Sequence, residues 1–267
     1  MAVKVQRTTS RDRSQLRNEY DIYQALQGRK GIPRVTWYSE SEDGAKMGME
    51  LLGRSVHDLH QARRLTQVKI LAIADQVLAL LEHVHTKRII HCDIKPSNIL
   101  IDRDLASDCI YMIDFGRARR LEDAVTTDRL TGTPLFASLD SHHGRLTVRG
   151  DLESLGYMLV YLYQGWLPWE GLEASTGNER IRKIEQSKMD LVPHGLCSSL
   201  PPEFLEYFQC LNTITNPGYR SLRPIFFRLH GRLARGHNVR PRRSTYVPPK
   251  VQSQGKGQRW TARGIRG

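Results

Sequence analysis

The chain has 267 residues, a length that suits one large domain or two small lobes with a buried core. Apolar residues make up 39% of the chain and aromatic residues 7%, as is typical of soluble globular proteins. The longest uncharged run, residues 154–169, is too short and too polar for a spanning helix, so we expect no transmembrane segment. The four cysteines lie far apart without metal-ligand spacing, which favours reduced thiols and a cytoplasmic location, with a nuclear one as the alternative.

The net charge of +12 is unevenly distributed. No Asp or Glu follows Glu206, and the last 61 residues carry 13 of the 40 Lys and Arg, so the rest of the chain is close to neutral. A basic C-terminal end indicates contact with a polyanion, which could be nucleic acid, an acidic partner or an anionic membrane surface. Its arginines and Trp260 would support weak, salt-sensitive contact, and we do not expect specific RNA or DNA recognition.

Residues 1–52 predict a small unit of strands with one helix. We expect its strands at residues 2–5, 35–38 and 46–51. Residues 13–27 carry apolar side chains at helical spacing, and Gly28 ends that helix. Gly53 marks the change from strands to helices.

Residues 53–235 are predicted to be mainly helical. We expect helices at residues 66–87, 151–164, 181–188, 202–211 and 225–233, and a polar loop at 117–139. Pro224 should mark the start of the last helix, because proline fits the first helical turn and not the interior. Residues 236–267 lack periodicity and are rich in Gly, Pro, Arg and Ser, which predicts a disordered basic tail.

The stretch that carries most chemical information is residues 89–116. Two short apolar runs, residues 99–101 and 110–113, each lie beside a polar cluster. The polar residues follow the order H-x-D-x-K-P-x-N and then D-F-G. Because this pattern is long and ordered, it is far more specific than three dispersed acids in turns would be.

Asp93, Asn98 and Asp114 have the residue types and spacing that phosphoryl transfer from ATP requires. Asp93 supplies a carboxylate that can orient an attacking hydroxyl and accept its proton. Asn98 and Asp114 supply an amide and a second carboxylate for the metal, expected to be Mg²⁺, that neutralises the phosphate oxygens. The sequence thus predicts a kinase catalytic loop followed by a metal-binding loop.

With three further segments, these residues resemble the eukaryotic protein kinases and, within them, the casein kinase I family. The segments are Met49–Leu59 (MELLGRSVHDL), Leu130–Asp140 (LTGTPLFASLD) and Asp151–Leu172 (DLESLGYMLVYLYQGWLPWEGL). The resemblance covers residues 2–235. It implies a two-lobed α+β fold with a reduced N-terminal β lobe at 1–52 and a mainly α-helical C-terminal lobe at 53–235. It also implies transfer of the γ-phosphate of ATP to Ser or Thr hydroxyls of protein substrates.

The resemblance assigns roles to residues of the smaller lobe. Lys4 matches the lysine that binds the α- and β-phosphates, and Glu19 matches its ion-pair partner. The alternatives are a solvated surface lysine and an exposed helix glutamate. Met49 matches the back of the adenine pocket, and Glu50 to Leu52 match the hinge whose backbone bonds adenine.

The resemblance also assigns roles in the larger lobe. Lys95 would contact the transferring phosphate, and its place two residues after Asp93 is the pattern of serine/threonine kinases. Thr133 would brace the catalytic loop and shape the site for the hydroxyl. Asp151 would hold the backbone of the catalytic loop, while on residue type alone it could be a helix N-cap.

The largest departure from the family pattern concerns the glycine-rich loop that covers the phosphates. Only three residues precede Lys4, so that loop has no room and the strand at 2–5 should have an open edge. A truncated gene model, a splice variant and a degenerate kinase each fit, and the intact catalytic groups favour truncation of an active ancestor. The alternative function is a weak or inactive pseudokinase scaffold whose basic tail binds polyanionic partners.

Two further departures concern regulation and substrate choice. Cys92 replaces the arginine that reads a phosphorylated activation loop, so we predict that loop phosphorylation is not the switch. Leu135 and residues 175–178 replace family cations that favour acidic or phosphorylated substrates, which predicts a weakened preference for primed substrates. The cations nearby in sequence that could substitute in part are Arg129, Arg145 and Arg149.

Overall fold

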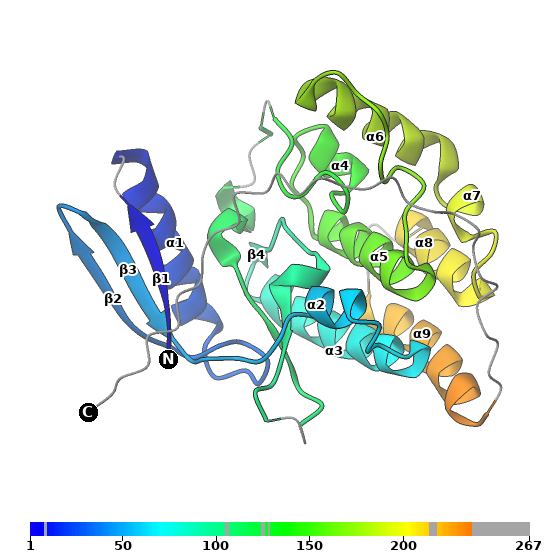
Figure 1. The fold of residues 1–267 in the computed structure, drawn as a ribbon, viewed down its shortest axis with the longest axis horizontal. Coiled ribbons are helices and arrows are strands. Elements are labelled where there is room, and N and C mark those ends of the chain that lie inside the picture. Colours follow the sequence, from blue (N-terminus) through cyan, green and yellow to red (C-terminus); the bar gives the residue numbers. More distant parts are fainter. Residues whose placement is uncertain (8–9, 105–106, 124–125, 128, 214–217, 237–267) are drawn as a thin grey trace.

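The computed structural model describes residues 1–7, 10–104, 107–123, 126–127, 129–213 and 218–236. Figure 1 shows a small sheet with one helix at one side of the molecule and a larger group of helices at the other. The protein therefore has an α+β fold of two lobes. The reduced lobe is the one that contains the small sheet and one helix. The basic tail from residue 237 lies outside the described residues, so its disorder stays a prediction, as do the domain boundaries.

The smaller lobe is a three-stranded antiparallel sheet with one helix packed on it. Its elements are β1 (Ala2–Arg7), α1 (Ser10–Leu26), β2 (Val35–Ser41) and β3 (Gly44–Met49). The strand order is β1-β3-β2, so β3 pairs on both sides and is buried at five of its six residues. Within the described residues β1 pairs only with β3. Helix α1 buries Leu16, Ile22 and Leu26 at helical spacing against this sheet.

The larger lobe is built around α5, which is buried from Gly150 to Tyr163. Its elements are α2 (Val56–Gln61), α3 (Gln67–Thr86), β4 (Ile89–Ile90), η1 (Pro96–Asn98), β5 (Ile99–Ile101), β6 (Ile110–Met112), η2 (Phe115–Arg117), β7 (Arg119–Arg120), η3 (Leu121–Asp123), α4 (Leu139–His142), α5 (Val148–Gln164), α6 (Gly177–Leu191), α7 (His194–Cys197), α8 (Pro202–Thr213) and α9 (Tyr219–Ala234). The Thr147 hydroxyl caps the start of α5, and Gly165 ends it in the left-handed region at φ 94°. No described helix is both long and apolar enough to span a membrane.

Pro224 is not at the start of the last helix, as the sequence predicts, but inside it. Helix α9 begins at Tyr219, so Pro224 is its sixth residue and cannot donate the bond expected to the carbonyl of Arg220. A proline in a helix interior costs about 3 kcal/mol. The helix nevertheless continues because Leu222 and Ile225 on either side of the proline are buried against the core. Packing of the apolar face outweighs the local preference here.

Candidate active site

Two antiparallel strand pairs bring the two predicted loops together. Strand β5 pairs with β6, and β4 pairs with β7. The catalytic loop, residues 91–98, connects β4 to β5, and the Asp114 loop, residues 113–118, connects β6 to β7. Because each loop leaves one pair and enters the other, the two loops must run side by side. Backbone pairing therefore brings the loops that carry Asp93 and Asp114 next to each other.

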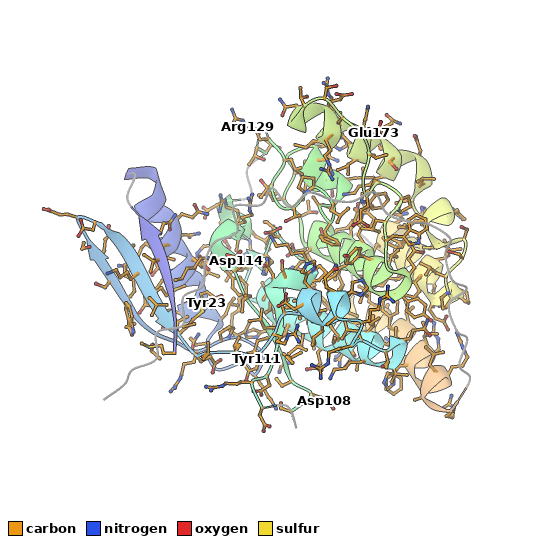
Figure 2. The ribbon with its side chains drawn as sticks, viewed as in Figure 1. Tyr23, Asp108, Tyr111, Asp114, Arg129 and Glu173 are labelled. Atoms are coloured by element: carbon orange, nitrogen blue, oxygen red, sulfur yellow. The ribbon has the colours of Figure 1, made fainter. Side chains whose placement is uncertain are left out.

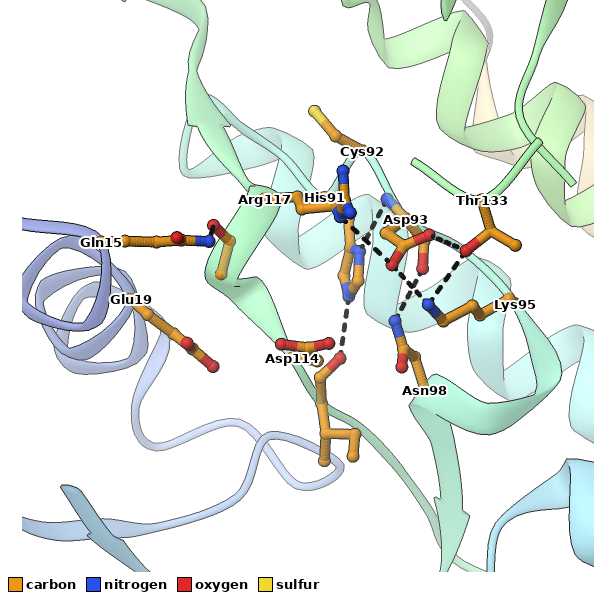
Figure 3. Close-up of polar contacts among 12 residues, drawn as sticks. Gln15, Glu19, His91, Cys92, Asp93, Lys95, Asn98, Asp114, Arg117 and Thr133 are labelled. Atoms are coloured by element: carbon orange, nitrogen blue, oxygen red, sulfur yellow. Dashed lines mark hydrogen bonds and ion pairs between the residues drawn. The ribbon is translucent and has the colours of Figure 1, made fainter. Parts of the chain in front are cut away.

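Asp93 forms a closed triangle of hydrogen bonds with Lys95 and Thr133 (Figure 3). Lys95 Nζ donates to Asp93 Oδ2 at 2.6 Å and to Thr133 Oγ1 at 3.0 Å. Thr133 Oγ1 donates to Asp93 Oδ1 at 2.7 Å. Both carboxylate oxygens thus have a partner, and the side chain of Asp93, of which 3% is exposed, is held in one orientation.

Asp151, on α5, supports the backbone of the catalytic loop. It lies in the first turn of α5, and its carboxylate accepts the N–H groups of His91 at 2.7 Å and Cys92 at 2.9 Å. His85 of α3 lies 2.9 Å from the same carboxylate. The N-cap of α5 is Thr147, so the alternative assignment of Asp151 as a helix cap is wrong. Its carboxylate serves the loop.

Asn98 and Asp114 offer oxygen atoms suited to a hard divalent cation. Asn98 Nδ2 donates to the carbonyl of Asp93 at 2.9 Å, so the amide oxygen points away from that bond. Asp114 has φ 66°, in the left-handed region, where the N–H donates to the Tyr23 hydroxyl oxygen at 3.0 Å. The described residues hold no cluster of three or more His, Cys, Asp and Glu that could bind a metal by itself. The donor set fits a metal that is also held by phosphate oxygens.

A buried ion cluster connects the smaller lobe to the Asp114 loop. Lys4 Nζ lies 2.7 Å from Glu19 Oε2 and 2.7 Å from Asp114 Oδ1. Burial disfavours the charged lysine, but the two carboxylates outweigh it and raise the pKa of Lys4 above its ordinary value. Burial likewise opposes ionisation of Asp114, yet Lys4 lowers its pKa below the ordinary value. Burial dominates at Glu19 and raises its pKa to about 7. Figure 2 shows Asp114 and Tyr23 at the junction of the two lobes.

Asp93, Lys95, Asn98 and Asp114 line one pocket of about 680 Å³, which we call the central pocket. Its other wall is the connection between the lobes, and the predicted hinge residues there are Met49, Glu50, Leu51 and Leu52. The main chain of Glu50 donates to the Arg34 carbonyl at 3.0 Å, and its side chain accepts the Arg34 N–H at 3.0 Å. These bonds hold the connection in place. Lys4, Glu19 and Thr133 are not among the residues that line this pocket.

Sequence reasoning missed three residues that contact the Asp114 loop or the pocket. Tyr23 binds the Asp114 N–H, and its ring packs on Phe115 at 5.0 Å between centroids. Gln15 Nε2 donates to the Gly116 carbonyl at 3.0 Å. Arg117 lines the central pocket. Tyr23 lies four residues after Glu19 on α1, so the helical face shared with Glu19 could have identified it.

The structure also shows what surrounds the departures from the family pattern. Cys92 packs with Ile90 and Leu146, and burial raises the pKa of its thiol above the ordinary value. Leu135 packs on the apolar core. A second pocket of about 890 Å³ is lined by Arg117, Arg129, Leu130, Gly132, Pro134, His142, Asn178, Ile181 and Arg182.

Of the three arginines that could substitute in part for the family cations, two do not line the second pocket. Arg145 Nη2 pairs with Asp140 at 2.7 Å, and Arg149 Nη2 donates to Asn212 at 2.8 Å. Arg129 does line the second pocket, where Arg117 and Arg182 join it. The sequence could not identify the latter two, because they come from other segments of the chain.

A comparison with known families agrees with this geometry. The family model for the protein kinase domain matches residues 1–212. Since this match covers well over half of the chain, the protein belongs to the protein kinase domain family. Proteins of this class use ATP and a divalent metal ion to phosphorylate protein substrates.

Proposed function

We propose that the protein is a serine/threonine protein kinase that transfers the γ-phosphate of Mg-ATP to hydroxyl groups of protein substrates. The observation that carries this proposal is that Asp93, Asn98 and Asp114 line one pocket between the lobes. A base and two metal ligands around one cleft are what phosphoryl transfer needs from a protein, because catalysis there is mostly positioning and charge stabilisation.

The proposed reaction uses Asp93 as the base. Its carboxylate holds the acceptor hydroxyl and accepts the proton as the acceptor oxygen bonds to the γ-phosphorus. The bond from the γ-phosphorus to the β–γ bridging oxygen breaks, and its electron pair leaves with ADP. Lys95 uses two of its three N–H donors on Asp93 and Thr133, which leaves the third for a phosphate oxygen. Lys95 would thus contact the base Asp93, the Thr133 hydroxyl and the transferred phosphate.

Asn98 and Asp114 are the residues proposed to hold Mg²⁺. The metal, when bound, would neutralise charge on the phosphate oxygens. Asp114 would bind the metal and also belongs to the buried ion cluster, since its Oδ1 pairs with Lys4. Lys4 would then reach the α- and β-phosphates while Glu19 fixes its side chain. Met49, Glu50 and Leu52 would receive the adenine at the other wall of the pocket.

The experiment that tests this function is a kinase assay of the purified chain against its Asp93→Asn form. We expect the substitution to lower the rate by about 10²- to 10⁴-fold, because the amide cannot accept the proton. Asp108→Asn is the matched control, since that side chain is 92% exposed and does not line the central pocket. Equal rates for the wild-type chain and Asp93→Asn would contradict the proposal.

A pseudokinase scaffold is the second candidate, and the pairing of Asp114 with Lys4 favours it. The proposed metal ligand Asp114 already binds the Lys4 amine through Oδ1 at 2.7 Å, an interaction that competes with metal binding. Titration with Mg-ATP by calorimetry separates the candidates. Binding without phosphoryl transfer, or no binding, would favour the scaffold.

Resemblance to casein kinase I narrows the proposal to that family. Among the segments that carry the resemblance, residues 130–140 contribute Leu130, Gly132 and Pro134 to the second pocket. Within it we propose a weakened preference for phosphate-primed substrates, because Leu135 packs on the core and Asn178 is uncharged. The arginines of that pocket should leave some affinity for anions.

Paired peptides with and without a phosphoserine upstream of the acceptor test this preference. We expect a primed-to-unprimed ratio of kcat/KM below about tenfold, with Asn178→Lys raising it. Gln209→Lys adds the same charge at an exposed site on α8 and should leave the ratio unchanged. A primed-to-unprimed ratio of kcat/KM above about 100 in the wild-type chain would contradict a weakened preference for primed substrates.

We also propose weak polyanion contact through the basic tail, residues 236–267, and a cytoplasmic or nuclear location. The support is the clustering of Lys and Arg there without any acid. Removing these residues should abolish salt-sensitive retention on heparin. Retention that survives the truncation would assign the contact to the folded lobes.

A further inference from the structure

Arg117 lies at the boundary of two cavities. It ends η2, directly after Gly116, and lines both the central pocket and the second pocket. Its Nε is 3.8 Å from Asp93 Oδ2, and 52% of its side chain is exposed (Figure 3). A half-exposed guanidinium is thus present within the proposed reaction site, although no role has so far been assigned to it.

The contact between Arg117 and Asp93 does not use the hydrogen-bonding capacity of the guanidinium. A separation of 3.8 Å is too long for a hydrogen bond, and a half-exposed ion pair contributes little. Among the described residues, no hydrogen bond donated by this guanidinium is found. Its N–H donors, which form a rigid fork that matches phosphate geometry, are therefore available to a ligand.

The two other cations near the site are already engaged. Lys4 is bonded to Glu19 and Asp114, and Lys95 is bonded to Asp93 and Thr133. Lys95 retains one N–H donor, fewer than a phosphoryl group with several charged oxygens can accept. Arg117 could provide several donors from the side where the phosphoryl group must approach Asp93.

We propose that Arg117 binds the γ-phosphate and stabilises the charge on the transferring phosphoryl group, an inference that rests on the proposed kinase function. As the acceptor oxygen bonds to the γ-phosphorus, its proton passes to Asp93 and the electron pair of the broken bond leaves with ADP. Arg117 donates N–H bonds to the equatorial phosphoryl oxygens throughout and loses no proton. It is an arginine supplied by the same chain.

Nucleotide binding tests this role without requiring catalysis. In the presence of Mg²⁺, we compare a non-hydrolysable ATP analogue with ADP, which lacks the γ-phosphate. Arg117→Leu should weaken binding of the analogue by about tenfold or more and binding of ADP by less than about twofold. Arg117→Lys keeps the charge but not the fork and should lie between. Arg120→Leu, an exposed arginine on β7 that lines neither pocket, is the control and should match the wild-type chain.

Steady-state kinetics supply the second measurement. Arg117→Leu should lower kcat by about 10²-fold while the KM for an unprimed peptide changes by less than about twofold. A change in peptide KM alone would assign Arg117 to substrate recognition in the second pocket and overturn the proposal. Equal weakening of both nucleotides, or no change, would also overturn it.

The two proposals fail in distinguishable ways. A wild-type chain with no more transfer activity than Asp93→Asn refutes the kinase function, while the nucleotide comparison still shows whether Arg117 reads the γ-phosphate. A wild-type chain that binds neither nucleotide refutes both. An active wild-type chain with an unaffected Arg117→Leu form refutes only the role of Arg117. Thermal unfolding of each variant checks that the exposed substitution leaves the fold intact.

Discussion

The two halves of the candidate active site are held by different kinds of interaction. The catalytic loop of the larger lobe is fixed by strand pairing and by buried N–H groups that donate to Asp151. The smaller lobe reaches the site through Lys4, whose position depends on an ion cluster with Glu19 and Asp114. The first arrangement involves short, directed bonds to a single carboxylate. The second balances charge against desolvation.

This difference indicates which half is the more robust. The support of Asp93 lies within the larger lobe, since α3, α5 and the strand pairs all belong to it. The contact between Lys4 and Asp114 crosses the lobes, so it depends on how the smaller lobe sits. We therefore expect the larger lobe alone to hold Asp93, the proposed base, in position. The smaller lobe should control nucleotide binding and its dependence on pH.

The largest expected effect is the loss of Asp151. Asp151→Ala removes the acceptor of two buried N–H groups, of His91 and Cys92, and should lower the free energy of unfolding by about 3 kcal/mol or more. Kinase activity should fall with it, because the loop that carries Asp93 loses its support. Urea unfolding measures the first effect. Asp151→Asn keeps one acceptor oxygen and should be intermediate, whereas a stability close to wild type for both variants would contradict the argument.

A second prediction concerns another buried support of the larger lobe. Lys188 is fully buried in α6, and its Nζ donates to the carbonyls of Pro134 at 2.8 Å and Ala137 at 2.5 Å. Lys188→Met should cost about 2 kcal/mol, because the two carbonyls lose their donor. Kinase assays should show a raised KM for peptide, since the carbonyls belong to the segment that borders the second pocket.

The pH dependence of this variant gives a sharper comparison. Burial lowers the pKa of Lys188 to about 7, so the unfolded state holds its proton more tightly between pH 7 and 10.5. The stability of the wild-type chain relative to Lys188→Met should therefore rise over that range. The groups that face the amine are His142, Glu153 and the rings of Tyr157 and Trp169. A difference that stays flat with pH would show that the amine keeps its ordinary pKa.

Sequence reasoning succeeded where the interactions are local. Asp93 and Asn98 lie in one loop between β4 and β5, and their residue types and spacing predicted a shared site; both line the central pocket. The same holds for the long helix at 67–86, whose apolar residues recur at helical spacing. The contact of Lys4 with Glu19 joins two elements through a loop, and only the family resemblance suggested it.

Sequence reasoning failed where burial contradicts residue type. Lys188 is fully buried while its neighbour Met189 is 54% exposed, the reverse of what hydropathy predicts. Two carbonyls from a distant segment stabilise the buried amine, and no local pattern reports such partners. Pro224 illustrates the same limit, because packing of α9 outweighs the preference of proline for a first turn. Arg117 went unnoticed because its pockets form only in three dimensions.

A third prediction tests the ion cluster of the smaller lobe. Burial raises the pKa of Glu19 from 4.5 to about 7, so the folded state binds its proton more tightly than the unfolded state does. The contribution of Glu19 to stability should be fully present below pH 4.5 and lost as pH rises to 7. Lys4, with its pKa raised above 10.5, and Asp114, with its pKa lowered below 3.8, do not titrate in that window.

Thermal or urea unfolding between pH 4.5 and 8 measures this contribution. Relative to Glu19→Gln, the wild-type chain should lose on the order of 1–3 kcal/mol across the window. Asp21→Asn removes an exposed carboxylate on the same helix and should run parallel to the wild-type curve. If the stability of Glu19→Gln also runs parallel to the wild-type curve, the attraction of Lys4 fully offsets the effect of burial on the pKa of Glu19.

The smallest expected effect is that of activation-loop phosphorylation. The family resemblance places Cys92 where a cation would bind such a phosphate, and the Cys92 side chain packs with Ile90 and Leu146. The catalytic loop is held from within the larger lobe by Asp151, so its geometry needs no phosphate. Phosphatase treatment of the purified kinase should therefore change its rate by less than about twofold.

Substitution of the loop threonines gives a second arm of this experiment. Thr127 is left in place, because its Oγ1 donates to the Arg129 carbonyl at 2.7 Å and its loss would disturb the loop itself. Thr126→Ala combined with Thr131→Ala removes two acceptor sites and should leave activity near that of the wild-type chain. A fall of about tenfold or more after either treatment, with an unchanged melting temperature, would show that the loop is switched by phosphate. The larger lobe would then need the phosphate to hold Asp93 in position. It would no longer be the more robust half of the site.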